Sequence, residues 1–306
     1  MEAKADESRR VRWSVALPTD DVERGDDLIS AAAIAEMAAA LEAAGVDACH
    51  VTDHPYPSEK WVATGGHHAL DPLVALSFAA AATSRINLHT NAFVAAYRHP
   101  ILAAHGIATL DTLSGGRVIL GLAGGYLEPE FTALGVDFRR RGSVLDHAVA
   151  TMKQAWTGLP GVAGGILRPV PVSRPHPPIW FGGNSGKAIH RVIASGQGWM
   201  PFPASRSLAT AVRTSALESL GDLARAIGEL RSAAERAGRL EPIDICCTPF
   251  SHPHHRAHLD PERLLEEAAA MESLGVTWLS VRLAAPSRTV FLKNVERFAN
   301  EVLQKR

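Results

Sequence analysis

The sequence lacks an excess of charge of either sign. Its 306 residues contain 31 Lys plus Arg and 32 Asp plus Glu, so the formal net charge is −1. A chain this close to neutral has no general electrostatic attraction for nucleic acid or for an anionic membrane surface. We therefore expect its partner to be a small-molecule substrate, with no nucleic acid and no membrane.

Cysteines and long apolar runs are also scarce. The three cysteines are Cys49, Cys246 and Cys247, and an odd number with an adjacent pair is a poor basis for a disulfide framework. The alanine-rich run at 73–83 is shorter than the roughly 18 apolar residues of a membrane span. Residues 1–10 are charged and lack the apolar core of a secretory signal. We expect a cytoplasmic protein with reduced cysteines.

Eight short β-rich runs alternate with helical patterns along the chain. Apolar residues spaced three to four apart predict helices over Asp27–Ala44, Asp222–Ala237 and Glu262–Leu274. Asp-Pro pairs, which combine a cap with a preferred first helical residue, predict helix starts at Asp71 and Asp260. The expected strands are Arg12–Leu17, Ala48–Thr52, Ile86–Thr90, Val118–Leu122, Pro178–Phe181, Gly198–Met200, Ile243–Thr248 and Thr277–Val281.

This alternation indicates an α/β fold with parallel strands and right-handed crossovers. Eight units fit a (β/α)8 TIM barrel, which typically has roughly 250 residues. An open doubly wound sheet is the alternative, although no Gly-x-Gly-x-x-Gly follows the first strand. We expect one barrel domain over residues 12–306 and a flexible N-terminal tail over 1–11. A Gly/Pro-rich insertion at about 158–177 is expected to lie over the barrel mouth.

Two polar residues directly follow the second expected strand. In a barrel, the C-terminal ends of the strands converge on one mouth, where such enzymes keep their active sites. His54 is therefore a candidate catalytic proton donor or acceptor, and Asp53 is a candidate to orient its ring or to bond nearby backbone. The alternative for His54 is a loop histidine without a catalytic role.

Glycines follow two further strands. Gly182, Gly183, Asn184 and Ser185 precede an expected helix, where exposed backbone N–H groups favour an anion. A plain glycine turn with an Asn or Ser cap is the alternative. The run 121–126 includes Gly124, Gly125 and Tyr126, and its small residues leave room either for a flat ring system or for tight packing.

Clustered histidines and arginines offer weaker signals. Four histidines near the seventh strand have no carboxylate or cysteine among them at ligand spacing, so we expect no metal site. The basic run Arg139–Arg141 is more typical of a solvated face or an interface than of a nucleic-acid site. The four histidines are His252, His254, His255 and His258.

Several segments occur in an order that points to one family. They are Thr52–His54, Tyr97–Pro100, Ala108–Arg117, Gly121–Phe131 and Pro177–Ser185. Together they resemble the bacterial-luciferase-like flavin and deazaflavin oxidoreductases, and the likeness runs from about Arg12 to Phe298. The resemblance implies a (β/α)8 barrel, usually a homodimer, that binds reduced FMN or the deazaflavin coenzyme F-420. The most similar branch uses F-420 as a hydride carrier.

The resemblance also implies roles for individual residues. His54 matches a histidine that family dehydrogenases place near the redox centre of the coenzyme, and Gly182–Ser185 matches the loop that receives the coenzyme phosphate. Thr90 and Asn91 match a strand end where the family often has a cis non-prolyl peptide bond behind the coenzyme ring. The ring is expected to lie over the ends of strands two to four, which include Gly124–Tyr126.

Some positions depart from the family pattern. Family sugar-phosphate dehydrogenases have a glutamate where this chain has Tyr126, and Trp61 is not at their spacing from His54. The resemblance therefore favours an F-420-dependent oxidoreductase without naming its substrate. The alternatives are an FMN-dependent monooxygenase on the same fold and, more distantly, a metal hydrolase or a flavin-binding protein without catalysis.

Overall fold

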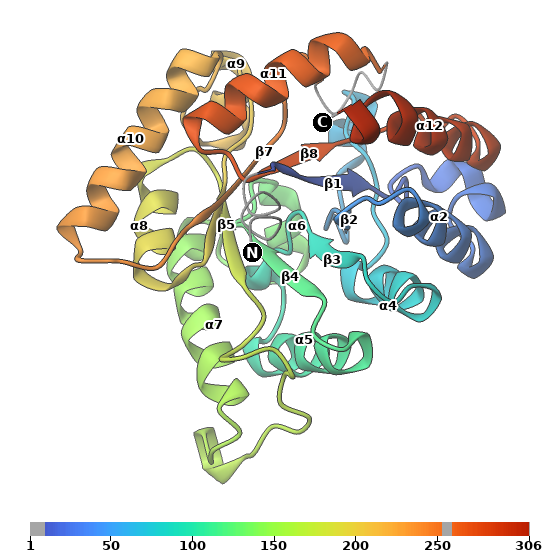
Figure 1. The fold of residues 1–306 in the computed structure, drawn as a ribbon. Coiled ribbons are helices and arrows are strands. Elements are labelled where there is room, and N and C mark those ends of the chain that lie inside the picture. The colour runs from blue at the N-terminus through green and yellow to red at the C-terminus, as the bar shows by residue number, and fades with distance from the viewer. Residues whose placement is uncertain (1–9, 253–258, 306) are drawn as a thin grey trace, which may run out of the picture.

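The computed structural model describes residues 10–252 and 259–305, which form a closed barrel of eight parallel strands (Figure 1). The strands pair in chain order, β1 with β2 through to β8, and β8 closes on β1. The (β/α)8 fold and all eight expected strands are thus confirmed, with ends that differ by at most two residues. The strands are β1 Arg12–Ala16, β2 Ala48–Val51, β3 Asn87–Thr90, β4 Val118–Leu122, β5 Ile179–Gly182, β6 Gly198–Met200, β7 Asp244–Cys247 and β8 Trp278–Val281.

One helix follows each strand on the outside of the barrel. The Asp71 and Asp260 side chains accept backbone N–H bonds at the starts of two of these helices, as expected from the Asp-Pro pairs. Gly275 ends one helix with a φ of 101°, a left-handed conformation that favours glycine. The outer helices are α2 Ala31–Ala43, α4 Pro72–Ala82, α5 Pro100–Ser114, α7 Arg141–Trp156, α8 Gly186–Ser195, α10 Leu220–Arg236, α11 Pro261–Leu274 and α12 Arg288–Glu301.

Three shorter helices lie in the connections that leave the C-terminal ends of the strands. They are α3 Glu59–Ala63 after β2, α6 Glu128–Ala133 after β4, and α9 Arg206–Val212 after β6. Because these connections start at the barrel mouth, their side chains can reach the space above the strands. The fold therefore builds its mouth mainly from the loops after β2, β4 and β6.

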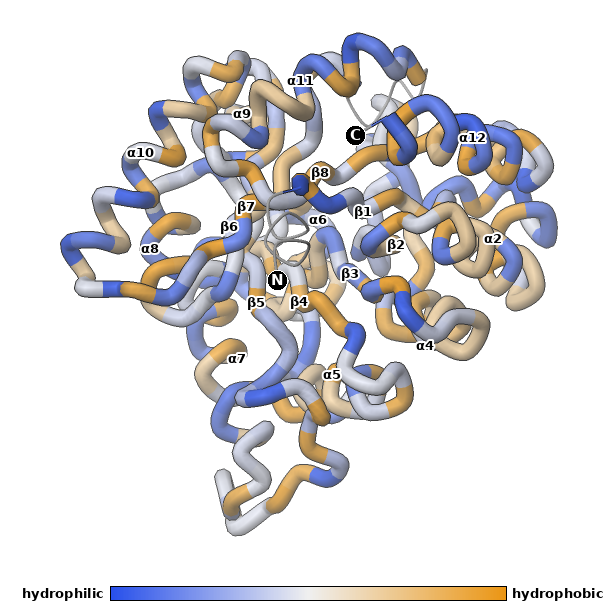
Figure 2. Tube along the Cα trace, viewed as in Figure 1, coloured by the Kyte–Doolittle hydropathy of each residue, from blue (hydrophilic) through white to orange (hydrophobic). Residues whose placement is uncertain are grey.

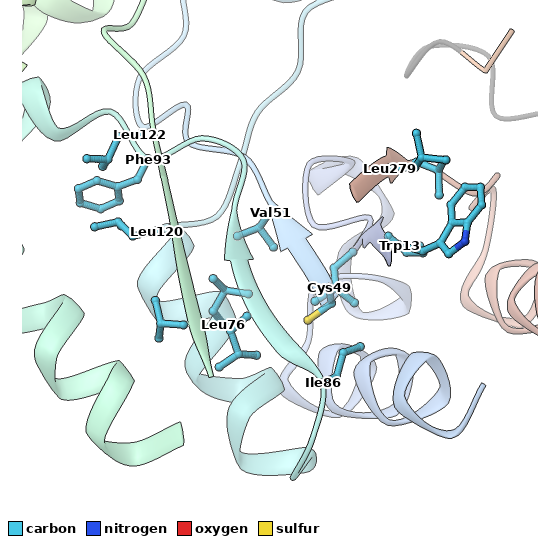
Figure 3. Close-up of a cluster of buried hydrophobic side chains, with 14 of the residues drawn as sticks. Trp13, Cys49, Val51, Leu76, Ile86, Phe93, Leu120, Leu122 and Leu279 are labelled. Carbon is cyan, nitrogen blue, oxygen red and sulfur yellow. The ribbon is translucent and has the colours of Figure 1, made fainter. Parts of the chain in front are cut away.

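The apolar core lies between the strands and the outer helices. Figure 2 shows hydrophobic residues along the central strands and hydrophilic ones on much of the outer helix surface. Figure 3 shows part of this core, where Cys49, Val51 and Leu76 lie between strands and the helix that contains Leu76. All three cysteines are buried and unpaired, as expected for small apolar residues within strands.

The Gly/Pro-rich segment at 158–177 does not lie over the mouth, so that expectation was wrong. It packs against the C-terminal end of α5, where the Ser173 amide and hydroxyl donate to the Asp111 carboxylate at 2.9 and 2.8 Å. Figure 1 shows it projecting beside α5 and α7. The physical reason is chain direction, because a segment that runs from a helix into the next strand must end at the N-terminal face of the barrel.

The structure describes only the last two residues, 10 and 11, of the expected N-terminal tail. Residues 1–9 lie outside the described residues. Val11, the last residue of the expected tail, is buried, and its amide donates to the Glu272 carboxylate at 3.1 Å. The ordered contacts of the barrel therefore begin before Arg12.

Candidate active site

A large cavity opens at the barrel mouth. Its volume is about 1790 Å³, and residues from the ends of all eight strands or from the loops after them line it. Ligand sites for small molecules usually measure about 300–1,000 Å³. This cavity is therefore large enough for a coenzyme and a substrate together.

His54 lies between two polar side chains in this cavity. Its Nδ1 is 3.3 Å from the Glu130 Oε2, and its Nε2 is 3.4 Å from the Tyr126 hydroxyl. The Trp61 ring packs against it with centroids 4.6 Å apart. Trp61 thus reaches the predicted catalytic histidine, although its sequence spacing departs from the family pattern.

Glu130 is the buried anchor of this group. Its Oε2 also accepts a 2.7 Å bond from the Tyr97 hydroxyl, and its Oε1 accepts the Tyr56 amide at 3.2 Å. Burial alone would raise the pKa of Glu130, but the hydrogen bonds from His54 and Tyr97 outweigh it and lower the pKa. A carboxylate only accepts hydrogen bonds, so His54 carries a proton on Nδ1 and directs Nε2 toward Tyr126.

Asp53 lines the cavity at the barrel mouth, where it was predicted, and its carboxylate is held by several hydrogen bonds. Its carboxylate accepts two bonds from the Arg98 guanidinium, at 2.6 and 3.0 Å, and one from the Val94 amide at 2.8 Å. Arg98 also pairs with Asp71 at the start of α4. The geometry gives Asp53 the second of its two expected roles, since it bonds nearby backbone and does not contact the His54 ring.

The end of β3 supports the cavity floor. The peptide bond between Asn91 and Ala92 is cis, as the family resemblance implies. Asn91 lines the cavity, and its side-chain amide donates to the Ser280 hydroxyl at 3.0 Å. Thr90 is fully buried and bonds the Gly121 carbonyl oxygen at 2.9 Å, so it lies behind the floor and not on its surface.

The two readings of the β4 glycines apply to different residues. A Cβ at Gly121 would lie 2.1 Å from the Thr90 carbonyl oxygen, so this glycine is required by tight packing. A Cβ at Gly124 would meet nothing within 4 Å, and Gly124 lines the cavity. Gly125 has a φ of 71°, and a Cβ there would clash with the Phe131 ring. Gly124 is therefore the glycine that leaves open space for a ligand.

The loop after β5 presents backbone groups to the cavity. Gly182, Gly183 and Ser185 line it, and Ser185 precedes α8 without making a side-chain cap bond. The first amides of α8 and the Ser185 hydroxyl are thus positioned for an anion. Asn184 instead braces the loop, because its side chain bonds the backbone of Phe202 and Ser215.

Five cations line the cavity together with the start of α8, and we call them the basic end of the cavity. Arg191 pairs with Asp146 and Arg213 with Glu128, whereas the described residues give the other three no ion pair with a carboxylate. Burial and the neighbouring positive charges lower the pKa of Arg141. Within the run Arg139–Arg141, expected to be a solvated face or an interface, Arg139 and Arg140 are exposed, and Arg139 and Arg141 line the cavity. The five cations are Arg139, Arg141, Lys187, Arg191 and Arg213.

Metal ligands are not assembled in the part of the chain that the structure describes. Within residues 10–252 and 259–305, no three His, Cys, Asp or Glu side chains are placed to hold an ion. The predicted histidine cluster is mostly outside these ranges, since His254, His255 and His258 are not described. The described member, His252, has its Nε2 2.6 Å from the Arg282 carbonyl oxygen.

Comparison with known proteins gives the family. The model of the luciferase-like monooxygenase family matches residues 12–274. The chain belongs to this family. Its fold is similar to the coenzyme F-420-dependent tetrahydromethanopterin reductase of Methanopyrus kandleri, with a TM-score of 0.72, 17% identity, and coverage of 97% of this chain and 99% of that one. No helix of the described residues is long and apolar enough to cross a membrane.

Two curated relatives use different coenzymes. An F-420-dependent glucose-6-phosphate dehydrogenase of Kineococcus radiotolerans is 38% identical over 128 residues, which are 40% of this chain and 36% of that protein. The oxygenase component of a flavin-dependent trigonelline monooxygenase of Acinetobacter baylyi is 26% identical over 166 residues, 49% of this chain and 46% of the relative. The chain thus spans less than half the length of either relative. The relatives of this chain thus include an F-420-dependent dehydrogenase and a flavin-dependent monooxygenase.

Replacing Tyr97 by Phe tests the buried anchor. The change removes the hydroxyl that donates to Glu130 at 2.7 Å, and we expect the free energy of unfolding at pH 7 to fall by about 1.5–3 kcal/mol. Tyr56→Phe is the matched control, because only the backbone amide of Tyr56 bonds Glu130 and its side chain is 69% exposed. Urea unfolding measures both effects.

The effect of Tyr97→Phe should depend on pH. Since folding lowers the pKa of Glu130, the stabilisation is present above the unfolded pKa and is lost as pH falls through the folded pKa. The difference between wild type and Tyr97→Phe should therefore shrink in acid. A loss at pH 7 no greater than that of Tyr56→Phe would contradict the assignment of Glu130 as an ionised anchor.

Proposed function

We propose that the protein is an oxidoreductase that uses coenzyme F-420 for hydride transfer to or from a small organic substrate. The observation that carries the proposal is His54, which lines the cavity and whose ring is oriented by the buried Glu130 so that Nε2 faces the Tyr126 hydroxyl. A positioned histidine of this kind can take or supply a proton at neutral pH. The curated F-420-dependent relative supports the same chemistry.

The cavity fits a coenzyme with an anionic end. Gly124 leaves open space near His54, where the flat ring would lie, and the start of α8 with the basic end would hold the phosphate. When bound, the coenzyme supplies or accepts the hydride. Asn91 and Gly124 would contact the bound coenzyme, and His54 would take or supply the proton that accompanies the hydride.

The charge at the basic end favours F-420 over FMN. Only two of its five cations have carboxylate partners among the described residues, which leaves a local excess of three positive charges. FMN ends in a single phosphate, whereas F-420 continues beyond its phosphodiester into a tail with several carboxylates. Arg139 and Lys187, which form no ion pair among the described residues, can pair with that tail.

Titration of the protein with F-420 and with FMN tests the coenzyme. We expect at least tenfold tighter binding of F-420, measured by coenzyme fluorescence. Arg139→Gln and Lys187→Gln should each weaken F-420 more than FMN, because they remove charge that only the longer tail uses. Lys293→Gln, on the exposed side of α12, is the control. Tighter binding of FMN would favour the FMN-dependent monooxygenase instead.

We also propose that the protein is a homodimer in a reducing cytoplasm. The three buried, unpaired cysteines support that compartment. Helices α4 and α5 present an exposed apolar face with Val74, Phe78, Ile101 and Leu102, of which Leu102 is 71% exposed. A second copy of the chain would cover this face by twofold symmetry, which is the commonest arrangement of soluble oligomers.

Sedimentation equilibrium tests the dimer. We expect twice the chain mass for the wild type and the monomer mass for Leu102→Glu, because a carboxylate in the centre of an apolar interface lacks a partner. Leu240→Glu is the matched control, since Leu240 is 95% exposed and lies far from α4 and α5 along the chain. A monomeric wild type, or a Leu102→Glu variant that stays dimeric, would disprove the assignment.

A further inference from the structure

The cavity has a second polar wall, at the ends of β1 and β8. Both terminal nitrogens of the Arg282 guanidinium donate to the Asp20 carboxylate, one of them at 2.6 Å. The Asp20 side chain is 6% exposed and that of Arg282 is 25% exposed. Both residues line the cavity, and the guanidinium is the more exposed of the two groups. We call Asp20, Arg282 and the adjacent His67 the β1–β8 wall.

This wall carries no net charge. Burial would raise the pKa of Asp20, but the bonds from Arg282 outweigh it and keep the carboxyl ionised. Arg282 is also ionised, because the bonds from Asp20 raise its pKa despite burial. It is the one Lys or Arg among the described cavity-lining residues outside the basic end. A phosphate group at this wall would lie beside the buried Asp20 carboxylate, whose negative charge cancels the attraction of Arg282 for it.

His67 adds a hydrogen-bond acceptor to the wall. Its Nδ1 lies 2.8 Å from the His68 carbonyl oxygen and 3.8 Å from the Asp20 Oδ2, so Nδ1 carries the proton. Burial lowers the pKa of His67, and the neutral ring then offers an unprotonated Nε2. Arg282 has five N–H donors, of which Asp20 uses two. A donor and an acceptor side by side match a carbonyl or hydroxyl group.

The surface between this wall and His54 is aromatic. The His67 ring lies 5.0 Å from the His54 ring and 5.4 Å from the Trp61 ring, measured between centroids. Tyr126 completes the group, with its ring centroid 5.7 Å from that of His54. Flat apolar groups pack well against such rings. A substrate whose reacting carbon lies near His54 would therefore place its apolar part against Trp61 and Tyr126.

We propose that the β1–β8 wall selects an uncharged alcohol or carbonyl compound with a flat apolar group, and excludes phosphate esters. The proposal rests on the proposed function for the reaction itself. In the oxidative direction, the alcohol carbon gives a hydride to the deazaflavin, and the hydroxyl gives its proton to His54 Nε2, which leaves a carbonyl group. Asp20 sets the selectivity because its charge cancels that of Arg282.

A matched pair of probes tests the wall. Benzyl alcohol and benzyl phosphate differ only in the anionic group, and calorimetric titration of the F-420-loaded protein gives both affinities with the basic end occupied. We expect the wild type to bind benzyl alcohol at least tenfold tighter than benzyl phosphate. Asp20→Asn leaves the Arg282 charge unbalanced, and should strengthen benzyl phosphate binding at least tenfold.

A double variant separates charge from misfolding. Asp20→Asn combined with Arg282→Gln makes the wall neutral again, so the affinity ratio should return toward that of the wild type. Thermal unfolding and F-420 affinity identify a variant that has lost its fold. In that case, the ratio of the two probe affinities in the wild type still tests the inference. Tighter binding of benzyl phosphate by the wild type, or a ratio unchanged by Asp20→Asn, would overturn the inference.

The proposed function can fail separately from this inference. Failure of the protein to bind either F-420 or FMN would contradict the proposed function. The same probes can then be titrated into the coenzyme-free protein and fitted to two sites, which separates binding at the basic end, common to wild type and Asp20→Asn, from binding at the wall. A difference below tenfold in benzyl phosphate affinity would then overturn the inference.

Discussion

The candidate site depends on one buried carboxylate. Glu130 lies in the short helix α6, and bonds the His54 ring, the Tyr97 hydroxyl and the Tyr56 amide. These three partners come from the loops after β2 and β3, so a single side chain joins three connections at the mouth. Because the carboxylate can only accept, it also fixes the proton on His54 Nδ1 and leaves Nε2 toward the Tyr126 hydroxyl. The hydrogen bond to Glu130 thus sets both the position of the His54 ring and the nitrogen that carries its proton.

Charge divides the cavity into two ends with different tasks. At the start of α8, positive charge exceeds the carboxylates that pair with it, and helix amides add to it. At the β1–β8 wall, the only guanidinium is cancelled by Asp20. With a formal net charge of −1, the chain gives no overall attraction to anions, so this local arrangement alone decides where one binds. Under the two proposals above, the coenzyme phosphate would bind at the basic end and the reacting substrate at the β1–β8 wall.

The fold could be predicted from the sequence because the hydrophobic periodicity, the helix caps and the turn residues all indicated the same alternation of strands and helices. The same rules placed His54, Asn91 and the β5 loop at the mouth. They could not separate residues that line the cavity from residues that brace its loops, since a polar side chain at a strand end can also satisfy backbone groups, as Thr90 and Asn184 do. The direction of the chain at 158–177 was a usable signal, and would have placed that segment at the N-terminal face.

Glu130 could not be found by listing the residues at the ends of the predicted strands. It follows β4 by eight residues and reaches His54 only because α6 turns the chain back over the mouth. Arg141 and Lys187 likewise enter the cavity from the first turns of helices. Residues of this kind lie in helices that begin in the loops at the barrel mouth. Contacts between separate loops, such as Trp61 on His54, depend on tertiary packing that spacing alone does not encode.

The central claim is that His54 moves the proton that accompanies hydride transfer. Its most direct test is the turnover of His54→Ala with F-420 and a neutral alcohol, alongside the affinity for F-420. We predict that turnover falls by roughly 10²–10⁴-fold while coenzyme affinity is largely kept. The exposed His105→Ala on α5 should leave both unchanged. Undiminished turnover of His54→Ala would contradict the account.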